Sequence, residues 1–346
     1  MAVIQTDALI IGAGPVGLFQ AFQLGLQEIR CHIVDALPHV GGQCVELYAN
    51  KPIYDIPGLV RCSGAELVAQ LSEQVKPFAP ELHLNQEVTH LTRHDAQHWR
   101  IETSAGTVFL SKTVFIAAGV GAFQTRRLAV QGAEVLQGKH LHDRLRPDLQ
   151  LQGQSVWVLG GEDAAIQATL QLLDLPDAQR PARVTLMHRR DVFQAEPASL
   201  QAMREALAQG RLQLQLGQVA GFDAPQAQLQ ALHIITPDGQ TVRMPAQQVL
   251  AFLGVSPKLG PVAQWGLAME RKQLLVNTEN FATSEPGIFA VGDINTYPGK
   301  KKLIVCGFHE ATLAAFGAAA LVHPERKTLL QYTTTSSTLH RLLGVA

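Results

Sequence analysis

Residues 7–25 read DALIIGAGPVGLFQAFQLG, a short apolar run followed by a glycine-rich turn and a pattern typical of a helix. Residues 156–172 read VWVLGGEDAAIQATLQL and repeat this plan about 148 residues later, counted from Gly12 to Gly160. A second apolar run follows each turn, CHIVD at 31–35 and RVTLMHRR at 183–190. Two such beginnings of a βαβ unit predict an α/β fold with two Rossmann-like dinucleotide-binding domains.

The first turn carries the spacing G-x-G-x-x-G, from Gly12 through Gly14 to Gly17, with Pro15 inside it. Gly12 permits a tight turn, Gly14 lets the backbone approach a pyrophosphate, and Gly17 lets the following helix pack closely on the strand. The diphosphate would then lie at a helix N-terminus, where free N–H groups favour negative charge. Asp35 ends the next strand, where a carboxylate can accept a hydrogen bond from a ribose hydroxyl, and this combination predicts a dinucleotide site.

The second strand of the second unit ends differently, in His188, Arg189 and Arg190 instead of an acid. Guanidinium groups at this position suit a 2′-phosphate, so the sequence predicts NADP rather than NAD as the ligand of this unit. The alternative interpretation is a basic strand end that is simply solvated.

The glycine turn of the second unit departs from the fingerprint. Gly160 and Gly161 are present, but Glu162 stands where the next fingerprint glycine is expected. A side chain there obstructs close approach of the backbone, and its carboxylate would repel a phosphate. We expect Glu162 either to turn away from the ligand or to weaken NADPH binding.

Composition excludes several other classes of protein. The 346 residues suggest about two domains, and the formal net charge of −1 gives no global basic field for nucleic acid or a membrane surface. The N-terminus has no basic region before its apolar run, and the apolar stretches at 114–123 and 311–322 are short for a bilayer span. The four cysteines and thirteen histidines show no metal-ligand spacing, so we expect no metal, reduced thiols and a cytoplasmic protein.

Six motifs occur in an order that resembles one family. They are IIGAGPVGL, the stretch from GGQC to YDIPG at 41–58, AAGVGAF at 117–123, the GG-x-DAA turn, HRRDVFQA at 188–195 and GIFAVGDI at 287–294. Together they resemble the thioredoxin-reductase-like flavoproteins over nearly the whole chain.

The cysteines decide which branch of that family the chain resembles. Residues 132–145 contain no cysteine where thioredoxin reductases carry CxxC, and Ala49 stands where a Cys-x4-Cys pair would place its second thiol after Cys44. Val16 occupies the position of the cysteine in the first glycine loop of bacillithiol-disulfide-reductase-like relatives. The remaining resemblance is to ferredoxin–NADP reductases of the thioredoxin-reductase-like type, which GDINTYPGKKKL at 292–303 and the tail QYTTTSS at 331–337 also resemble.

The resemblance implies a discontinuous FAD-binding domain, residues 1–120 plus 288–346, with an NADPH-binding domain inserted at 121–287. Asp35 would hold the ribose of FAD, and Asp293 would reach its ribityl or pyrophosphate region. The remaining residues implied around FAD are Gln43, Tyr48, Val88, Phe123, Tyr332 and Thr334. Aromatic rings such as Tyr48 and Tyr332 are reasonable covers for a flat apolar flavin, although either tyrosine could instead be an ordinary packing residue.

The function implied is transfer of electrons between NADPH and ferredoxin or flavodoxin through FAD, in either direction, by a homodimer. No general acid or base is expected, because the flavin carries the chemistry. Two alternatives stay open. One is an NADPH-dependent reductase of a disulfide or small molecule, and reduction of a disulfide would need a cysteine pair such as Cys44 with Cys306. The other is a flavin-binding sensor.

An acidic electron carrier needs a local basic surface on a chain of this net charge. Lys300, Lys301 and Lys302 form the densest basic run, and Arg126 with Arg127 forms a second candidate. The alternative is that the three lysines are a solvated loop with no partner.

Overall fold

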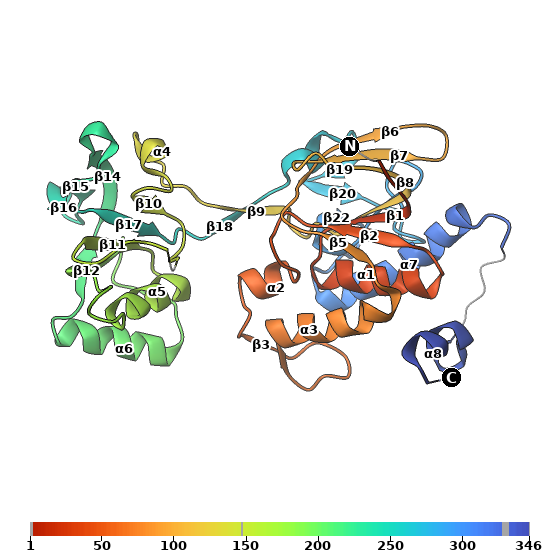
Figure 1. The fold of residues 1–346 in the computed structure, drawn as a ribbon, viewed down its shortest axis with the longest axis horizontal. Helices are drawn as coiled ribbons and strands as arrows, with labels where there is room; N and C mark the ends of the chain where they lie inside the picture. The colour runs from red at the N-terminus through yellow and green to blue at the C-terminus, as the bar shows by residue number, and fades with distance from the viewer. Residues whose placement is uncertain (1–2, 147, 327–331, 346) are drawn as a thin grey trace. The chain divides into compact units, whose positions relative to one another are not determined.

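The computed structural model describes residues 3–146, 148–326 and 332–345, and only the backbone of residues 122–125 and 255–258. The chain divides into two compact units, each with its own central sheet (Figure 1). Each unit also buries its own hydrophobic clusters, as expected of two domains.

The second unit is inserted into the first. Unit 1 consists of Met1–Ala122 and Pro257–Ala346, and unit 2 of Phe123–Ser256. The second joint differs from the sequence interpretation, because residues 257–287 lie in unit 1 and not in the inserted unit. The boundary expected after residue 287 is therefore not a joint between the units.

Unit 1 is built on a seven-stranded sheet with the order β5-β2-β1-β8-β7-β6, in which β21 also pairs with β8. Strands β5, β2, β1, β8 and β21 are parallel to one another. Strands β6, β7 and β8 pair antiparallel in succession, so β6 and β7 extend the sheet on the other side of β8. Placing β1 between β2 and β8 is the Rossmann arrangement, in which the first crossover leaves a crevice at the carboxyl end of β1. The strands are β1 Ile4–Ile11, β2 Cys31–Val34, β5 Glu81–His83, β6 Val88–Arg93, β7 Trp99–Thr103, β8 Val108–Ile116 and β21 Ile288–Ala290.

Both faces of this sheet are covered, which explains why β1 is apolar on both sides. Ala8 and Ile10 belong to one buried cluster, whereas Leu9 and Ile11 belong to the other. Successive side chains of a strand point to opposite faces, so this division is what a buried parallel strand requires.

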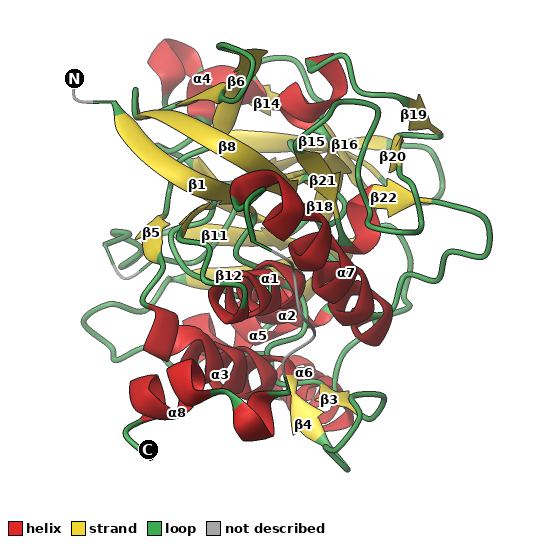
Figure 2. Cartoon of the chain, turned by 90° about the vertical axis from the view of Figure 1, so that its right-hand side faces the viewer, coloured by secondary structure: helices red, strands yellow, loops and turns green. Residues whose placement is uncertain are grey.

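Three helices cover the first face: α1 (Pro15–Leu26), α3 (Gly64–Val75) and α7 (Ile304–Val322). Helices α1 and α7 pack against each other (Figure 2), with the ring centroids of Phe19 and Phe308 4.7 Å apart. These contacts fix the start of α1 against the sheet.

The second face is covered by residues that the sequence had assigned to the inserted domain. Val262, Leu267 and Leu274 are buried in the same cluster as Leu9 of β1. This packing is the physical reason for the corrected boundary, since it ties the segment to the sheet of unit 1. These elements are η3 Gly260–Gln264, β19 Met269–Glu270 and β20 Gln273–Leu275. Strand β20 pairs with β22 (Asn295–Thr296), which the predicted FAD-binding domain already included.

Unit 2 repeats the parallel sheet on a smaller scale. Its five strands have the order β10-β17-β11-β12-β13, and all of their pairings are parallel. Strands β11 and β12 take the places that β1 and β2 have in unit 1, which confirms the internal repeat predicted from the sequence. The strands are β10 Leu141–His142, β11 Ser155–Leu159, β12 Arg183–His188, β13 Gln213–Leu216 and β17 Gln248–Ala251.

The two faces of this sheet carry different structures. The helices α5 and α6 pack on Val156 and Val158 of β11, and an antiparallel sheet with α4 packs on Trp157 and Leu159. The elements are α4 Ala133–Leu136, α5 Asp163–Leu173, α6 Pro197–Ala208, β14 Gln218–Asp223, β15 Ala231–Ile235 and β16 Thr241–Pro245.

The short elements connect these parts. They are α2 Gln43–Glu46, β3 Pro52–Ile53, β4 Cys62–Ser63, η1 Lys76–Phe78, β9 Ala122–Thr125, η2 Pro225–Ala227, β18 Val255–Lys258, η4 Gly292–Ile294, η5 Thr333–Thr335 and α8 Ser337–Leu343.

Helix α7 is longer than the apolar stretch expected from the sequence. Its 19 residues, Ile304–Val322, are long and apolar enough by length and composition to cross a membrane. In unit 1 the face of α7 that includes Ala311, Ala314 and Ala318 is buried against the core, and Glu310 within the helix is fully buried. This face of α7 is therefore part of the hydrophobic core of unit 1.

The close approach of α1 to β1 gives a test of the fold. An added Cβ at Gly17 would lie 1.9 Å from the carbonyl oxygen of Gly12, whereas one at Gly14 would meet nothing within 4 Å. We expect Gly17→Ala to lower the free energy of unfolding of the ligand-free protein by at least about 2 kcal/mol, because the helix must move off the strand. Gly14→Ala is the control and should change it by less than about 1 kcal/mol. Urea denaturation measures both, and equal values would contradict this packing.

Candidate functional site

The first glycine loop joins β1 to α1, and each of its glycines has a separate structural reason. Gly12 has φ of +112°, and a Cβ there would lie 2.5 Å from the carbonyl oxygen of Ala117. Gly17 packs on the backbone of Gly12, while the space beside Gly14 is open. The structure therefore places the tight turn, the close packing and the open approach at the predicted positions.

Helix α1 presents unsatisfied N–H groups to that open space. Pro15 is its first residue, and the N-cap Gly14 has no side chain to accept hydrogen bonds from the first turn. The free N–H groups and the helix dipole together make this end of a helix suited to an anionic group such as a diphosphate.

Asp35 braces the same loop. Its carboxylate accepts hydrogen bonds from the backbone N–H of Ala13 at 2.6 Å and of Leu37 at 2.8 Å. Burial raises the pKa of the Asp35 carboxyl, and these two N–H groups act in the opposite direction. Carboxylate oxygens have further lone pairs, so Asp35 can hold the loop and still accept from a ribose hydroxyl.

The segment after β2 returns to the glycine loop. The N–H of Gly41 donates to the carbonyl of Ala13 at 2.8 Å, and a Cβ on Gly42 would lie 3.2 Å from Cα of Gly14. Gln43 begins α2, and its Nε2 lies 3.1 Å from where a Cβ of Gly119 would stand. Gln43 is therefore placed between the two glycine-bearing turns that follow β1 and β8.

Tyr48 lies beyond α2 and contacts the thiol of Cys44, which donates to its hydroxyl at 3.6 Å. Burial is the main cause that raises the pKa of both groups. Val88 begins β6, and its side chain is buried in the core of unit 1, so a contact with a cofactor would have to come from its backbone.

Three residues expected around FAD are not brought to the glycine loop by any described contact. The side chain of Phe123 lies outside the described residues. Tyr332 and Thr334 are exposed, and Tyr332 accepts hydrogen bonds from Thr335 only locally, through its carbonyl oxygen. Their position over a flavin stays a prediction.

The second glycine loop repeats the hydrogen bonds of the first. The N–H of Gly160 donates to Met187 at the end of β12, as the N–H of Gly12 donates to Val34 at the end of β2. A Cβ on Gly160 would lie 2.6 Å from the carbonyl oxygen of Phe252, matching the contact of Gly12 with Ala117.

Glu162 occupies in this loop the place that Gly14 has in the first. It is the N-cap of α5 with extended backbone, φ −100° and ψ 171°, against −70° and 178° at Gly14. Its side chain is exposed and makes no hydrogen bond to the first turn of the helix. The backbone of the turn is thus preserved, and an acidic side chain stands where the first loop has the open face of Gly14.

The basic strand end has two distinct parts. A Cβ on Gly161 would lie 2.1 Å from the ring of His188, so His188 forms a wall of the loop and Gly161 is required by that contact. Burial, with Arg189 and Arg190 as lesser causes, lowers the pKa of His188. Arg189 and Arg190 are exposed, and within the described chain neither has an ion-pair partner. Two guanidinium groups are therefore available to a phosphate.

Comparison with known proteins shows the family to which the chain belongs. Residues 6–314 match the family model described as pyridine nucleotide-disulphide oxidoreductase. The chain belongs to this family. Proteins of the family bind FAD and NADP(H). In the structure all four cysteines, Cys31, Cys44, Cys62 and Cys306, are free thiols.

Individual relatives cover nearly the whole chain. The chain is 52% identical to ferredoxin–NADP reductase 2 of Cupriavidus metallidurans, over 99% of this chain and 92% of that protein. It is 55% identical to the ferredoxin–NADP reductase of an Acidovorax species, strain JS42, over 98% of this chain and 96% of that protein. Among solved structures, thioredoxin reductase of Lactococcus lactis has a TM-score of 0.60 at 22% identity, covering 92% of this chain and 99% of that one. Bacillithiol disulfide reductase of Staphylococcus aureus has a TM-score of 0.65 at 18% identity, covering 90% of this chain and 98% of that one. The last two show the shared fold.

A buried ion pair, which was not predicted from the sequence, lies next to the turn that carries Asp293. Lys300 pairs with Glu310 of α7, and the side chains are 7% and 0% exposed. Lys300 also donates to the carbonyl oxygen of Gly292 at 2.8 Å. Lys300 is therefore not part of a solvated loop, and the prediction that it helps to dock an acidic partner is wrong.

Glu310 accepts several hydrogen bonds from the turn that carries Asp293. It accepts hydrogen bonds from the N–H of Gly292 at 2.7 Å, Nδ2 of Asn295 at 2.8 Å and the hydroxyl of Tyr297 at 3.0 Å. Burial raises the pKa of the Asp293 carboxyl, while Lys300 and Lys302 lower it. The ion pair thus fixes the backbone on either side of Asp293.

Removing one partner of this pair should be costly. Lys300→Met leaves the Glu310 carboxylate buried without its counter-charge, and we expect a loss of about 3 kcal/mol or more in the free energy of unfolding. Lys301→Met is the matched control at an exposed lysine, with an expected change within about 0.5 kcal/mol. Urea unfolding compares the two variants. A small and equal effect of both would mean that Lys300 is solvated like its neighbours.

Proposed function

We propose that this protein is an FAD-dependent ferredoxin–NADP reductase that transfers electrons between NADPH and ferredoxin. The observation that carries the proposal is the identity above 50% with ferredoxin–NADP reductases over nearly the full length of the chain. The two glycine loops support it independently, because one is followed by an acid and the other by an arginine pair. Flavodoxin as a second partner, a homodimer and a cytoplasmic location belong to the same proposal.

In this proposal the two units have separate tasks. Unit 1 holds FAD, with the diphosphate at the start of α1 and Asp35 on the ribose. Unit 2 holds NADP(H), with Gly160 and Gly161 below the diphosphate and the arginines on the 2′-phosphate. Bound FAD supplies the exchange between two-electron and one-electron transfer, so the protein provides binding and orientation and not acid–base catalysis.

The arginine pair gives the test of cofactor choice. Replacing Arg189 and Arg190 together by Ala removes two charge-assisted contacts with the 2′-phosphate, each contributing about 1.5–3 kcal/mol. We expect KM for NADPH to rise at least about tenfold while KM for NADH stays nearly unchanged. Steady-state reduction of a small neutral acceptor with each nucleotide measures this. Equal effects on the two nucleotides would remove the assignment of the 2′-phosphate to this strand end.

The ferredoxin surface is proposed at Lys301 and Lys302. Both are exposed, unlike Lys300, and Lys302 lies close enough to Asp293 to lower its pKa. This places positive charge beside the turn proposed to meet FAD, where an acidic carrier would have to approach. Arg126 and Arg127, also exposed, form the second candidate surface.

Charge reversal separates steering from binding of the nucleotide. We expect Lys301→Glu with Lys302→Glu to lower ferredoxin-linked kcat/KM severalfold at low salt, and the difference to shrink at 0.5 M salt, where the screening length is about 4 Å. NADPH-dependent reduction of a neutral acceptor should not change. Lys139→Glu with Lys272→Glu, both exposed, makes the same change of net charge elsewhere. A ferredoxin rate that is unchanged at low salt, or lowered equally by the control pair, would move the docking surface elsewhere.

Disulfide reduction is the alternative activity, and the thiols argue against it. Burial raises the pKa of Cys44 and Cys62, and that of Cys31 to about 12. A thiol must ionise to attack a disulfide, so buried thiols of this kind are poor nucleophiles. Anaerobic assays of the purified protein with NADPH, comparing ferredoxin-linked cytochrome reduction with disulfide reduction, distinguish the two activities.

A further inference from the structure

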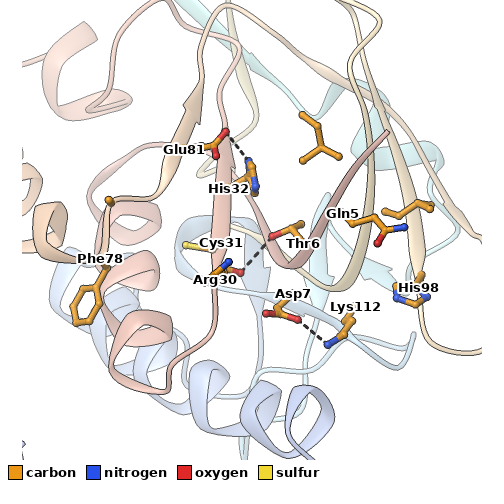
Figure 3. A pocket seen from close by; sticks show the side chains of 13 residues that line it. Gln5, Thr6, Asp7, Arg30, Cys31, His32, Phe78, Glu81, His98 and Lys112 are labelled. Carbon is orange, nitrogen blue, oxygen red and sulfur yellow. Dashed lines mark hydrogen bonds and ion pairs between the residues drawn. The ribbon is translucent and has the colours of Figure 1, made fainter. Parts of the chain in front are cut away.

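Two histidines and a glutamate meet at one edge of the unit 1 sheet. His32 lies on β2, and Glu81 and His83 lie on β5, the edge strand that pairs with it. The parallel register sets His32 opposite Glu81, and His83 follows two residues later on the same face of its strand. Figure 3 shows His32 and Glu81 turned toward each other at the rim of a pocket.

The three side chains are close enough to share one ion. Nδ1 of His32 lies 3.0 Å from Nε2 of His83 and 3.7 Å from a carboxylate oxygen of Glu81. One ligand atom from each residue lies within 4.8 Å of the other two. Ligands about 2.0–2.2 Å from a tetrahedral zinc ion stand roughly 3.3–3.5 Å apart, so small side-chain rotations suffice.

The imidazoles are held in place by the core. Phe109, which is fully buried, packs edge-on against His32 and His83 with ring centroids 5.7 and 5.0 Å away. Their position therefore requires no rearrangement of the strands.

The exposed side chain of Glu81 leaves a path by which an ion can reach the site from solvent. The side chain of Glu81 is 73% exposed, while that of His32 is 13% exposed. A pocket of about 640 Å³ opens beside them, and its wall also includes Asp7, paired with Lys112 at 2.7 Å. An ion can reach the partly buried nitrogens from this side and keep water in its remaining positions.

We propose that His32, Glu81 and His83 form a binding site for one divalent first-row transition-metal ion, with zinc as the representative case. Two imidazoles and one carboxylate favour such ions over Mg²⁺ and Ca²⁺, which prefer oxygen ligands alone. The sequence expectation of no metal rested on local spacing, and these ligands lie on strands far apart in the sequence.

The bound ion would cross-link β2 to the edge strand β5. The carbonyl of His83 accepts the N–H of Asp35 at 3.0 Å, so this edge strand also holds the residue that braces the first glycine loop. The cross-link stabilises unit 1 at that point, and it is independent of whether the protein reduces ferredoxin.

The test is calorimetric titration of untagged, chelator-treated protein with Zn²⁺, using Mg²⁺ as the comparison ion. We expect about one Zn²⁺ per chain with a micromolar dissociation constant and no measurable Mg²⁺ binding. At about a hundredfold excess over that constant, the midpoint of thermal unfolding should rise by roughly 2–5 °C.

Variants separate this site from the free thiols and the other histidines. Glu81→Gln keeps the shape of an exposed side chain and should weaken Zn²⁺ at least about tenfold, and His83→Ala should weaken it further. His94→Ala, an exposed histidine on the turn after β6, is the control and should bind like the unaltered chain. If Zn²⁺ binds equally well to Glu81→Gln and His83→Ala, or not at all to the original protein, the three residues are a packed, hydrogen-bonded cluster and the proposal is wrong.

Discussion

The contact between Gly17 and the carbonyl group of Gly12 is the constraint on which unit 1 depends. It allows α1 to begin directly at the end of β1, so the free N–H groups of the helix and the open face of Gly14 point into one space. Unit 2 solves the same problem with a small change. Ala165 stands where unit 1 has Gly17, and its Cβ would come within 2.8 Å of a Cβ on Gly160. Gly160 is retained because its φ of +149° and the carbonyl oxygen of Phe252, 2.6 Å from an added Cβ, both exclude a side chain.

Much of this arrangement could be predicted from the sequence, because the signals are local. The glycine spacing, Asp35 at one strand end and Arg189 with Arg190 at the other are read within single βαβ units. The backbone hydrogen bonds of the two glycine turns, from Gly12 to Val34 and from Gly160 to Met187, also form within single βαβ units, which similar sequences build in similar ways. The repeat of the two units was predictable for the same reason.

What could not be predicted depends on distant packing. Three consecutive lysines look alike along the chain, but Lys300 is buried because α7 brings Glu310 against it. His32 and His83 become neighbours only when β5 pairs with β2. The segment 257–287 has no composition that assigns it to either unit, and only its packing on the unit 1 sheet does so.

The two ends of the inserted unit lie next to each other. Near its two ends, the N–H of Arg126 donates to the carbonyl of Gly254 at 2.9 Å. A module whose ends are already adjacent imposes almost no loop-closure entropy on the chain that hosts it. A different domain with adjacent ends could therefore replace residues 123–256 without a change to the strands of the host, which makes this architecture suited to recombination as well as to stepwise substitution.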